Sequence, residues 1–282
     1  MKGDSTWQRK KESGVNVLWN GAKKEDHDGA DPYSATDLQI GPNECNGLKD
    51  QHYFSRDTMA DIIDNDFCPG IESELHKDDF TSTDKKYVKA FLDGTPESTI
   101  VTVSWGDDVD VKSITADQCK KVMHQILDEC DRDGSSDKNG PITNPLNWKA
   151  GGDARAGHDS IFGEWSYSIT PIPYRQPAYT KQFVTCTLDW VGDDNRGHLE
   201  VKGGGWLNSG QGHELKDKLG EHKFDPQDWV FTYGNGGEGN NLWEWDVTLS
   251  IAAGDTDGLT VEDVMAQVMG RDKPDWECAV PS

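Results

Sequence analysis

The segment TADQCKKVMHQILDEC, residues 115–130, constrains the fold of this chain more than any other feature. Thr115 and Gln118 form a capping-box pattern, and the apolar side chains recur at helical spacing. We therefore predict an amphipathic helix that carries Cys119 and ends at Cys130. Eleven residues of helix would separate these cysteines by about 16 Å. Because the Cα atoms of a disulfide lie only about 4.4–6.8 Å apart, Cys119 and Cys130 cannot pair with each other.

The chain has an even number of cysteines, namely Cys45, Cys68, Cys119, Cys130, Cys186 and Cys278. None forms a CxxC pair or lies near a histidine at zinc spacing, so we predict no metal site, and we predict no cofactor. The count favours three disulfides and an oxidising compartment over the alternative of six unrelated buried thiols. About 12 of about 15 pairings remain once the Cys119–Cys130 pair is excluded. Because Cys186 and Cys278 lie far along the chain, we expect at least one disulfide to join the helix to the second half.

The charge of the chain is strongly acidic, with 51 Asp plus Glu against 28 Lys plus Arg and a formal net charge of -23. Such a surface repels phosphate groups, so nucleic acid and anionic membranes are poor candidate partners. No apolar run approaches the roughly 20 residues that a membrane-spanning helix needs. The first residues lack the apolar segment of a signal peptide. The protein is therefore either cytosolic or, as the cysteines favour, extracellular with its leader already removed.

The periodicity of the remaining chain predicts an α+β fold. We expect a short helix over residues 55–68 and another that is capped by Thr260. Alternating apolar residues predict strands at KKYVKAFLDG, STIVTVSW, EWSYSITPIPY, QFVTCTLDWV, HLEVKG, WVFTYG and LWEWDVTLSIAA. The expected architecture is an antiparallel β-sheet or sandwich with two to three packed helices, stapled by disulfides. Residues 1–40 are predicted to be a partly flexible arm with one short strand at VNVLW, and residues 41–282 a single domain.

The loop CDRDGSSDKNGP, which follows the helix predicted over residues 115–130, has the composition of a calcium-binding loop. Such a loop needs glycine at its sixth position and a glutamate at its end. Counting from Asp131 places Ser136 where the glycine belongs, and counting from Ser135 ends on Leu146 instead of glutamate. We therefore interpret the segment as an acidic turn that lies in solvent and is tethered by Cys130.

Acidic residues beside tryptophans are the candidate catalytic groups, namely Glu164, Asp189, Glu244 and Asp246. A glycoside hydrolase uses one protonated and one ionised carboxyl group, about 5 to 9 Å apart across a cleft. Glu244 and Asp246 are two residues apart on a predicted strand, so both should project from the same sheet face. The alternative is that these acids face solvent, as many of the 51 acids must.

Tryptophans of the predicted sheet are the candidate ligand contacts, namely Trp190, Trp206, Trp243 and Trp245. Flat aromatic rings stack on the faces of sugars and provide large apolar contact areas. Alternation would place Trp243 and Trp245 on one face of their strand. The alternative is that these rings form a tryptophan-rich core.

The segments CKKVMHQILDECD, NPLNWKAGG and WSYSITP resemble a cysteine-containing domain of secreted fungal proteins. The resemblance rests on Cys119, Cys130, Asp131, Asn144, Pro145, Asn147, Lys149, Gly151 and Gly152. That domain occurs alone and beside family 18 chitinase modules, which implies an extracellular setting near cell walls. The acidic D-x-x-D-x-D-x-E motif of family 18 chitinases is not found here, so the resemblance supplies no catalytic residue.

Two classes of function therefore stay open ahead of a third, a structural or toxin-type protein whose partner is another protein. The first is a secreted acidic fungal protein that binds a glycan or a cell-surface protein at a cell wall or host surface, as an effector with carbohydrate recognition. The second is an acid-type glycoside hydrolase or lyase that uses the strand-borne carboxylates. The sequence decides neither whether the protein is an enzyme nor its oligomeric state.

Overall fold

The computed structural model describes residues 8–12, 15–19, 38–81, 83–107, 109–137, 140–157, 165–175, 181–191, 196–234, 243–252, 258–272, 274 and 276–280. Most of the predicted N-terminal arm lies outside these ranges. Within the arm, β1 (Gln8–Glu12) pairs with β2 (Val15–Trp19), which is the strand predicted at VNVLW. No helix in the described ranges is both long enough and apolar enough to cross a membrane.

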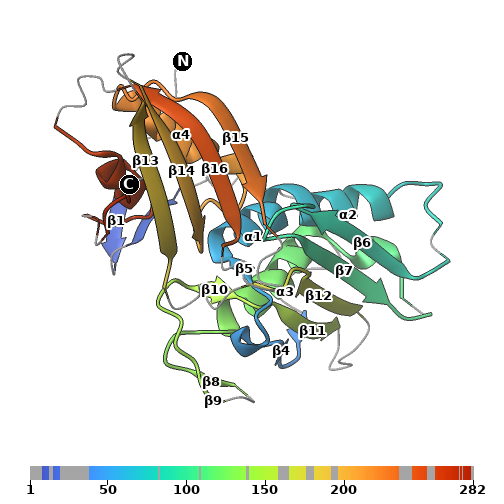
Figure 1. The fold of residues 1–282 in the computed structure, drawn as a ribbon. Helices are drawn as coiled ribbons and strands as arrows, with labels where there is room; N and C mark the ends of the chain where they lie inside the picture. Colours follow the sequence, from blue (N-terminus) through green and yellow to red (C-terminus); the bar gives the residue numbers. More distant parts are fainter. Residues whose placement is uncertain are drawn as a thin grey trace.

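The first of two main sheets is antiparallel and is drawn at the lower right of Figure 1. Its strands lie in the order β3 (Gln39–Ile40), β11 (Gly152–Gly157), β12 (Trp165–Pro171), β7 (Thr99–Trp105) and β6 (Lys86–Phe91), and β4 (Glu44–Cys45) also pairs with β11. Val103 and Tyr167 are fully buried, whereas their strand neighbours Ser104 and Ser168 are partly exposed. Alternation therefore divides this sheet into a buried inner face and an exposed outer face.

In the described ranges, helices cover the inner face of the first sheet. α1 (Arg56–Ile62), the π-helical turn η2 (Ile63–Phe67) and α2 (Cys68–Leu75) follow one another directly, so this helical run extends beyond the helix predicted over residues 55–68. α3 (Ala116–Glu129) is the predicted amphipathic helix, and it begins with the predicted capping box. The buried side chains of these helices form one core with the inner residues of the sheet.

The second main sheet is drawn at the upper left of Figure 1 and has a separate core. Its order is β13 (Phe183–Val191), β14 (Arg196–Gly204), β16 (Trp245–Ala252) and β15 (Gln227–Tyr233), all antiparallel. The turn η5 (Gly210–Gly212) leads into α4 (His213–Glu221), and α5 (Val261–Val268) begins with the predicted cap at Thr260. Both helices pack on one face of the sheet, so the second half repeats the layering of the first.

Short elements complete the described fold: η1 (Leu48–Asp50), β5 (Phe54–Ser55) paired with β10 (Trp148–Lys149), η3 (Val111–Ser113), and β8 (Ser136–Asp137) paired with β9 (Gly140–Pro141). The predicted α+β class with antiparallel sheets and disulfides is confirmed. The described residues contain five α-helices, more than the two to three expected.

The disulfides pair Cys45 with Cys130, Cys68 with Cys119, and Cys186 with Cys278. The exclusion of a Cys119–Cys130 bond is confirmed. The prediction that a disulfide joins the helix over residues 115–130 to the second half of the chain was wrong, because each bond joins two cysteines within the same half. Cys68 begins α2, which packs against α3, and residues 278–279 lie beside β13, where Leu188 donates its amide to the carbonyl of Ala279.

The two halves meet at an ion pair between Arg175 and Glu244, which we call the seam. Both side chains are fully buried, and Arg175 donates to both carboxylate oxygens of Glu244 at 2.7 and 2.6 Å. The guanidinium carbon of Arg175 lies 4.3 Å from the ring centre of Tyr53 and 4.8 Å from that of Trp148. The seam thus takes Tyr53 and Arg175 from the first half and Glu244 from the second. The single domain predicted for residues 41–282 stays a prediction, and the seam is the contact that favours it.

Candidate functional site

Two hollows adjoin on the first half of the protein and share Glu44 as a lining residue. The sheet hollow has a volume of about 330 Å³ and is lined by Gly41, Pro42, Glu44, Asp153, Ala154, Arg155 and Ser166. The disulfide hollow has a volume of about 680 Å³ and is lined by Asn43, Glu44, Cys45, Glu129, Asp131, Arg132, Ser135, Ser136 and Ile142. Each lining combines carboxylates, one guanidinium group and hydroxyl groups, which together offer both donors and acceptors of hydrogen bonds.

Two glycines bring the strands around the sheet hollow close together. Gly151 has φ +71°, and a Cβ atom there would lie 2.0 Å from the carbonyl oxygen of Ile169. Gly152 has φ +156°, and a Cβ atom there would lie 2.6 Å from the carbonyl oxygen of Glu44. These positions therefore require glycine, and the GG of NPLNWKAGG is explained by the approach of β4 and β12 to β11.

Buried polar side chains hold the loop between α3 and β10. The carboxylate of Asp131 accepts the amide of Ala150 at 2.8 Å, and the side-chain amide of Asn144 donates to the carbonyls of Asp131 and Trp148, both at 2.7 Å. The ammonium group of Lys149 donates to the carbonyl of Cys130 at 2.8 Å, and burial lowers its pKa. Because Asp131 is only 2 % exposed, the interpretation of this loop as lying in solvent was wrong for Asp131.

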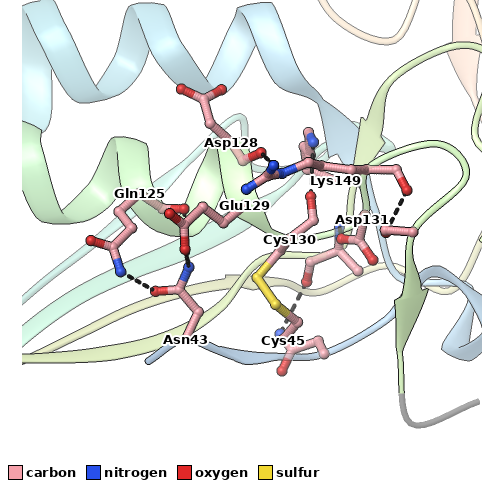
Figure 2. The surroundings of a disulfide bond; sticks show 12 residues. Asn43, Cys45, Gln125, Asp128, Glu129, Cys130, Asp131 and Lys149 are labelled. Atoms are coloured by element: carbon pink, nitrogen blue, oxygen red, sulfur yellow. Dashed lines mark hydrogen bonds between the residues drawn. A yellow bond between two sulfur atoms is a disulfide. The ribbon is translucent and has the colours of Figure 1, made fainter. Parts of the chain in front are cut away.

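Figure 2 shows the surroundings of the Cys45–Cys130 bond, which joins β4 to the end of α3. Several of the labelled residues line the disulfide hollow, namely Asn43, Cys45, Glu129 and Asp131. Asn43 donates its side-chain amide to the Glu129 carboxylate at 3.1 Å and accepts from the amide of Gln125 at 3.2 Å. These contacts fix the segment that carries Glu44 against α3. The disulfide and Asn43 thus position the residue that both hollows share.

The outer face of the first sheet continues the sheet hollow as two rows of side chains that cross four strands. Strand register places Arg155, Ser166, Ser104 and Lys86 opposite one another in the first row, and Asp153, Ser168, Thr102 and Val88 in the second. All eight residues are at least partly exposed. The sheet therefore presents a strip of hydroxyl groups that lies between Asp153 and Arg155 on β11 and Lys86 and Val88 on β6.

The predicted catalytic acids do not form a pair. Glu164 lies outside the described residues. Glu244 precedes β16 and is fully buried in the seam, so it is not available as a general acid in a cleft. Glu244 and Asp246 lie on the same face of the second sheet, since a Cβ atom at Gly204, which shares the outer face of β14 with Lys202, would lie 3.1 Å from the Cγ atom of Glu244, and Lys202 lies opposite Asp246. Asp246 is partly exposed there, whereas the seam buries Glu244.

Asp189 and Asp246 are too far apart to act together. Asp189 is exposed opposite His198 on β14, and Asp246 lies opposite Lys202, four residues further along the same strand. Four residues of strand span about 13 Å, and the two acids lie on strands at opposite sides of β14. A glycoside hydrolase needs carboxyl groups within about 9.5 Å of each other, so Asp189 and Asp246 do not form the pair that the hydrolase alternative requires. Burial raises the pKa of Asp246.

The predicted tryptophan contacts separate into core and surface residues. Trp206 and Trp245 are 3 % and 0 % exposed, and their rings meet at 4.7 Å in an edge-to-face contact. They are therefore core residues, which favours the alternative that these rings form a tryptophan-rich core over the prediction that a ligand contacts them. Trp243 lies 4.6 Å from the ammonium group of the outer-face Lys202, so the expected common face with Trp245 was wrong. Trp190 is 46 % exposed.

One group of side chains in the described ranges has the spacing of metal ligands, formed by Cys186, Cys278 and Glu262. The two sulfur atoms are bonded to each other, so they cannot act as thiolate ligands. Glu262 instead accepts the backbone amide of Cys278 at 2.9 Å. The group is a disulfide with a nearby carboxylate.

Asp153 and Arg155 were not identified as candidates from the sequence. The segment GDARAG of β11 alternates small, buried residues with charged, exposed ones, which is a signal for a strand with one polar face. The segment was missed because it lacks large apolar residues. Its glycines and alanines are what permit the close packing around the sheet hollow.

Residues 42–172 match the family model Fungal_lectin_2, which is described as "Putative glycan binding domain". The match covers 131 residues, 42 to 172 inclusive, of the 282 in the chain. Apart from Gly41, it contains every residue that lines the two hollows, and it contains both rows of the outer face. It supports the resemblance to a fungal domain as one to a fungal glycan-binding domain, whereas an association with chitinase modules is not shown. All four predicted tryptophan contacts lie outside it.

Comparisons with curated proteins and with solved structures gave no match.

Proposed function

We propose that this protein binds a glycan on the outer face of the first sheet, with one sugar unit in the sheet hollow. The observation that carries the proposal is that the matched glycan-binding segment contains this hollow and the hydroxyl rows that extend from it. Glu44 and Asp153 accept hydrogen bonds from sugar hydroxyl groups, and the guanidinium of Arg155 donates to sugar oxygens. The proposed contacts are therefore polar and come from residues that the strand register places side by side.

The proposed ligand is an uncharged glycan. The chain has a formal net charge of -23, and the sheet hollow itself carries two carboxylates against one guanidinium. A uronate or sulfate group would be repelled at this surface, because like charges in a cleft with few counter-charges raise the free energy of binding. Neutral hexose and N-acetylhexosamine polymers avoid this cost.

The proposed setting is extracellular, at a fungal cell wall or a host surface, where the protein acts as a binding protein or effector. Three observations support this setting. The six cysteines are all paired in disulfides, which persist in oxidising compartments. The matched family is a fungal lectin family, and the sequence resembles a domain of secreted fungal proteins. Cell-wall glycans are accordingly the first ligands to test.

The proposal is tested by isothermal titration of the full chain with neutral gluco-, manno- and chito-oligosaccharides. The variants Asp153→Ala and Arg155→Ala should each weaken binding of the best ligand at least about tenfold, since hydrogen bonds to a charged group contribute about 1.5–3 kcal/mol. Asp189→Ala is the matched control, because Asp189 is also an exposed strand aspartate but lies on the second sheet. Unchanged affinity in both first-sheet variants, or an equal loss in the control, would remove the sheet hollow as the site.

A further inference from the structure

The outer face of β12 carries a line of hydroxyl side chains that follows the strand from the sheet hollow toward the seam. Ser166, Ser168 and Thr170 lie on this face at successive alternate positions of β12. Ile172 follows beyond the end of the strand, where its amide still donates to the carbonyl of Ser98 at 2.9 Å and its side chain is 48 % exposed. Six residues of extended chain from Ser166 to Ile172 span about 20 Å.

An exposed aromatic ring stands just past the end of this line. Tyr174 is 45 % exposed. Gln51 donates its side-chain amide to the Tyr174 hydroxyl at 2.5 Å, and the ring of His52 meets the Tyr174 ring at 5.8 Å with the planes 77° apart. Because the two rings are nearly perpendicular, His52 covers at most one face of the Tyr174 ring.

The position of Tyr174 is fixed from both sides. The next residue, Arg175, is anchored in the seam, and its amide donates to the carbonyl of Gln51 at 2.7 Å. On the other side, a ring nitrogen of His52 lies 3.0 Å from the carbonyl oxygen of Ile172. An aromatic ring that is ordered before the ligand arrives loses little entropy on binding, and tyrosine combines a large apolar face with few rotatable bonds.

We infer that Tyr174, with Gln51 and His52 as its supports, is a second subsite that stacks on one sugar ring of an extended neutral glycan. This inference rests on the proposed function, since the other end of the same glycan would occupy the sheet hollow at Arg155. The apolar C–H face of a pyranose ring is the chemical group that a flat exposed tyrosine accommodates. A disaccharide in the sheet hollow is too short to reach Tyr174, so the subsite discriminates by chain length.

The test compares a disaccharide with a hexasaccharide of the same linkage, taken from the gluco-, manno- and chito-series, by isothermal titration. Tyr174→Ala should weaken hexasaccharide binding about five- to tenfold, because the variant loses the ring that stacks on the apolar face of one sugar. Disaccharide binding should change less than about twofold. Tyr174→Phe keeps the ring and should retain hexasaccharide binding. Trp190→Ala is the matched control, because Trp190 is equally exposed but lies on the second sheet.

The outcomes separate the inference from the proposed function. If the hexasaccharide binds no more tightly than the disaccharide, or if Tyr174→Ala leaves hexasaccharide binding intact while Arg155→Ala weakens both ligands, the second subsite is overturned and the sheet hollow stands. If the unaltered protein binds none of the oligosaccharides, both are overturned. Thermal unfolding of Tyr174→Ala near that of the unaltered protein shows that the variant is folded.

Discussion

Both sheets of this protein carry helices on one face, yet the two halves differ in what the other face carries. In the second half, Trp206 and Trp245 are buried in the core, and the outer face carries charged residues such as the Lys202–Glu200 ion pair. In the first half, small residues of β11 open the sheet hollow and hydroxyl groups fill the outer face. Buried tryptophans belong to the core in both halves, as Trp148 and Trp165 do in the first, and the proposed glycan site lies on the polar outer face of the first sheet.

The largest effect is expected where the halves depend on each other, at the seam. Arg175→Met should lower the free energy of unfolding by about 3–5 kcal/mol, because it leaves the Glu244 carboxylate buried without its counter-charge. Urea denaturation followed by circular dichroism measures this. The control is Lys202→Ala, which breaks a partly exposed ion pair with Glu200 and should cost no more than about 1 kcal/mol. A loss for Arg175→Met as small as that of the control would show that the halves do not depend on the seam.

Disulfide removal should act within one half at a time. The double variant Cys68→Ser/Cys119→Ser should lower the free energy of unfolding by about 2–4 kcal/mol and speed amide hydrogen exchange in α2 and α3. Cys186→Ser/Cys278→Ser should instead speed exchange in β13 and α5, which Cys278 contacts through Glu262. Exchange that rises equally in both halves for either variant would contradict the separation of the two cores.

A pH dependence of stability is expected at the first-half side of the seam. Glu97 is 1 % exposed, and burial raises the pKa of its carboxyl group although Arg175 and the amide of Ser55 oppose the shift. The folded state therefore holds this proton more tightly than the unfolded state. The stabilisation that this bound proton provides is complete below the pKa of about 4.3 in the unfolded state, and it is lost as the pH rises through the pKa of Glu97 in the folded state.

Glu97→Gln should remove this contribution. The difference in unfolding free energy between the unaltered protein and the variant should change with pH by at most about 1.4 kcal/mol per pH unit, in the direction of lower relative stability at higher pH. The measurement is the difference in denaturation midpoint between the two proteins from pH 4 upward. Taking the difference cancels the contribution of the exposed acids that both proteins share. A difference that stays constant over this range would contradict the assignment to Glu97.

The smallest effects are expected at the exposed tryptophans of the second half. Trp190→Ala and Trp243→Ala should each change glycan affinity less than about twofold, since both residues lie outside the strand rows that extend the sheet hollow. Titration with the best oligosaccharide measures this. A tenfold loss in either variant would restore the prediction that tryptophans of the second sheet contact the ligand.

The regular elements were predictable because their signals are local. The capping boxes at Thr115 and Thr260 and the alternation of every predicted strand are contained in a few neighbouring residues, and all of these elements are present. The face assignment of Trp243 failed because Trp243 lies two residues before β16, which begins at Trp245, and strand alternation does not fix the direction of a side chain outside the strand.

The site was less predictable because its determinants are long-range. Glu244 has the appearance of a surface acid beside a strand, and its burial depends on Arg175, which lies 69 residues away in the sequence. The sheet hollow depends on Gly152, whose conformation admits β4 beside β11. Neither relation leaves a periodic pattern. The NPLNWKAGG segment was recognised by resemblance, and the structure supplies its physical reason.

Binding of a glycan on the first sheet is tested by mapping backbone amide chemical shifts during titration with the best neutral oligosaccharide. If the glycan binds there, the largest shifts should occur at residues 41–45 and along β11, β12 and β7, with small shifts in β14 and β16. Largest shifts in β13, β14 or β16, around Trp190 and Trp243, would contradict it and place the ligand on the second sheet.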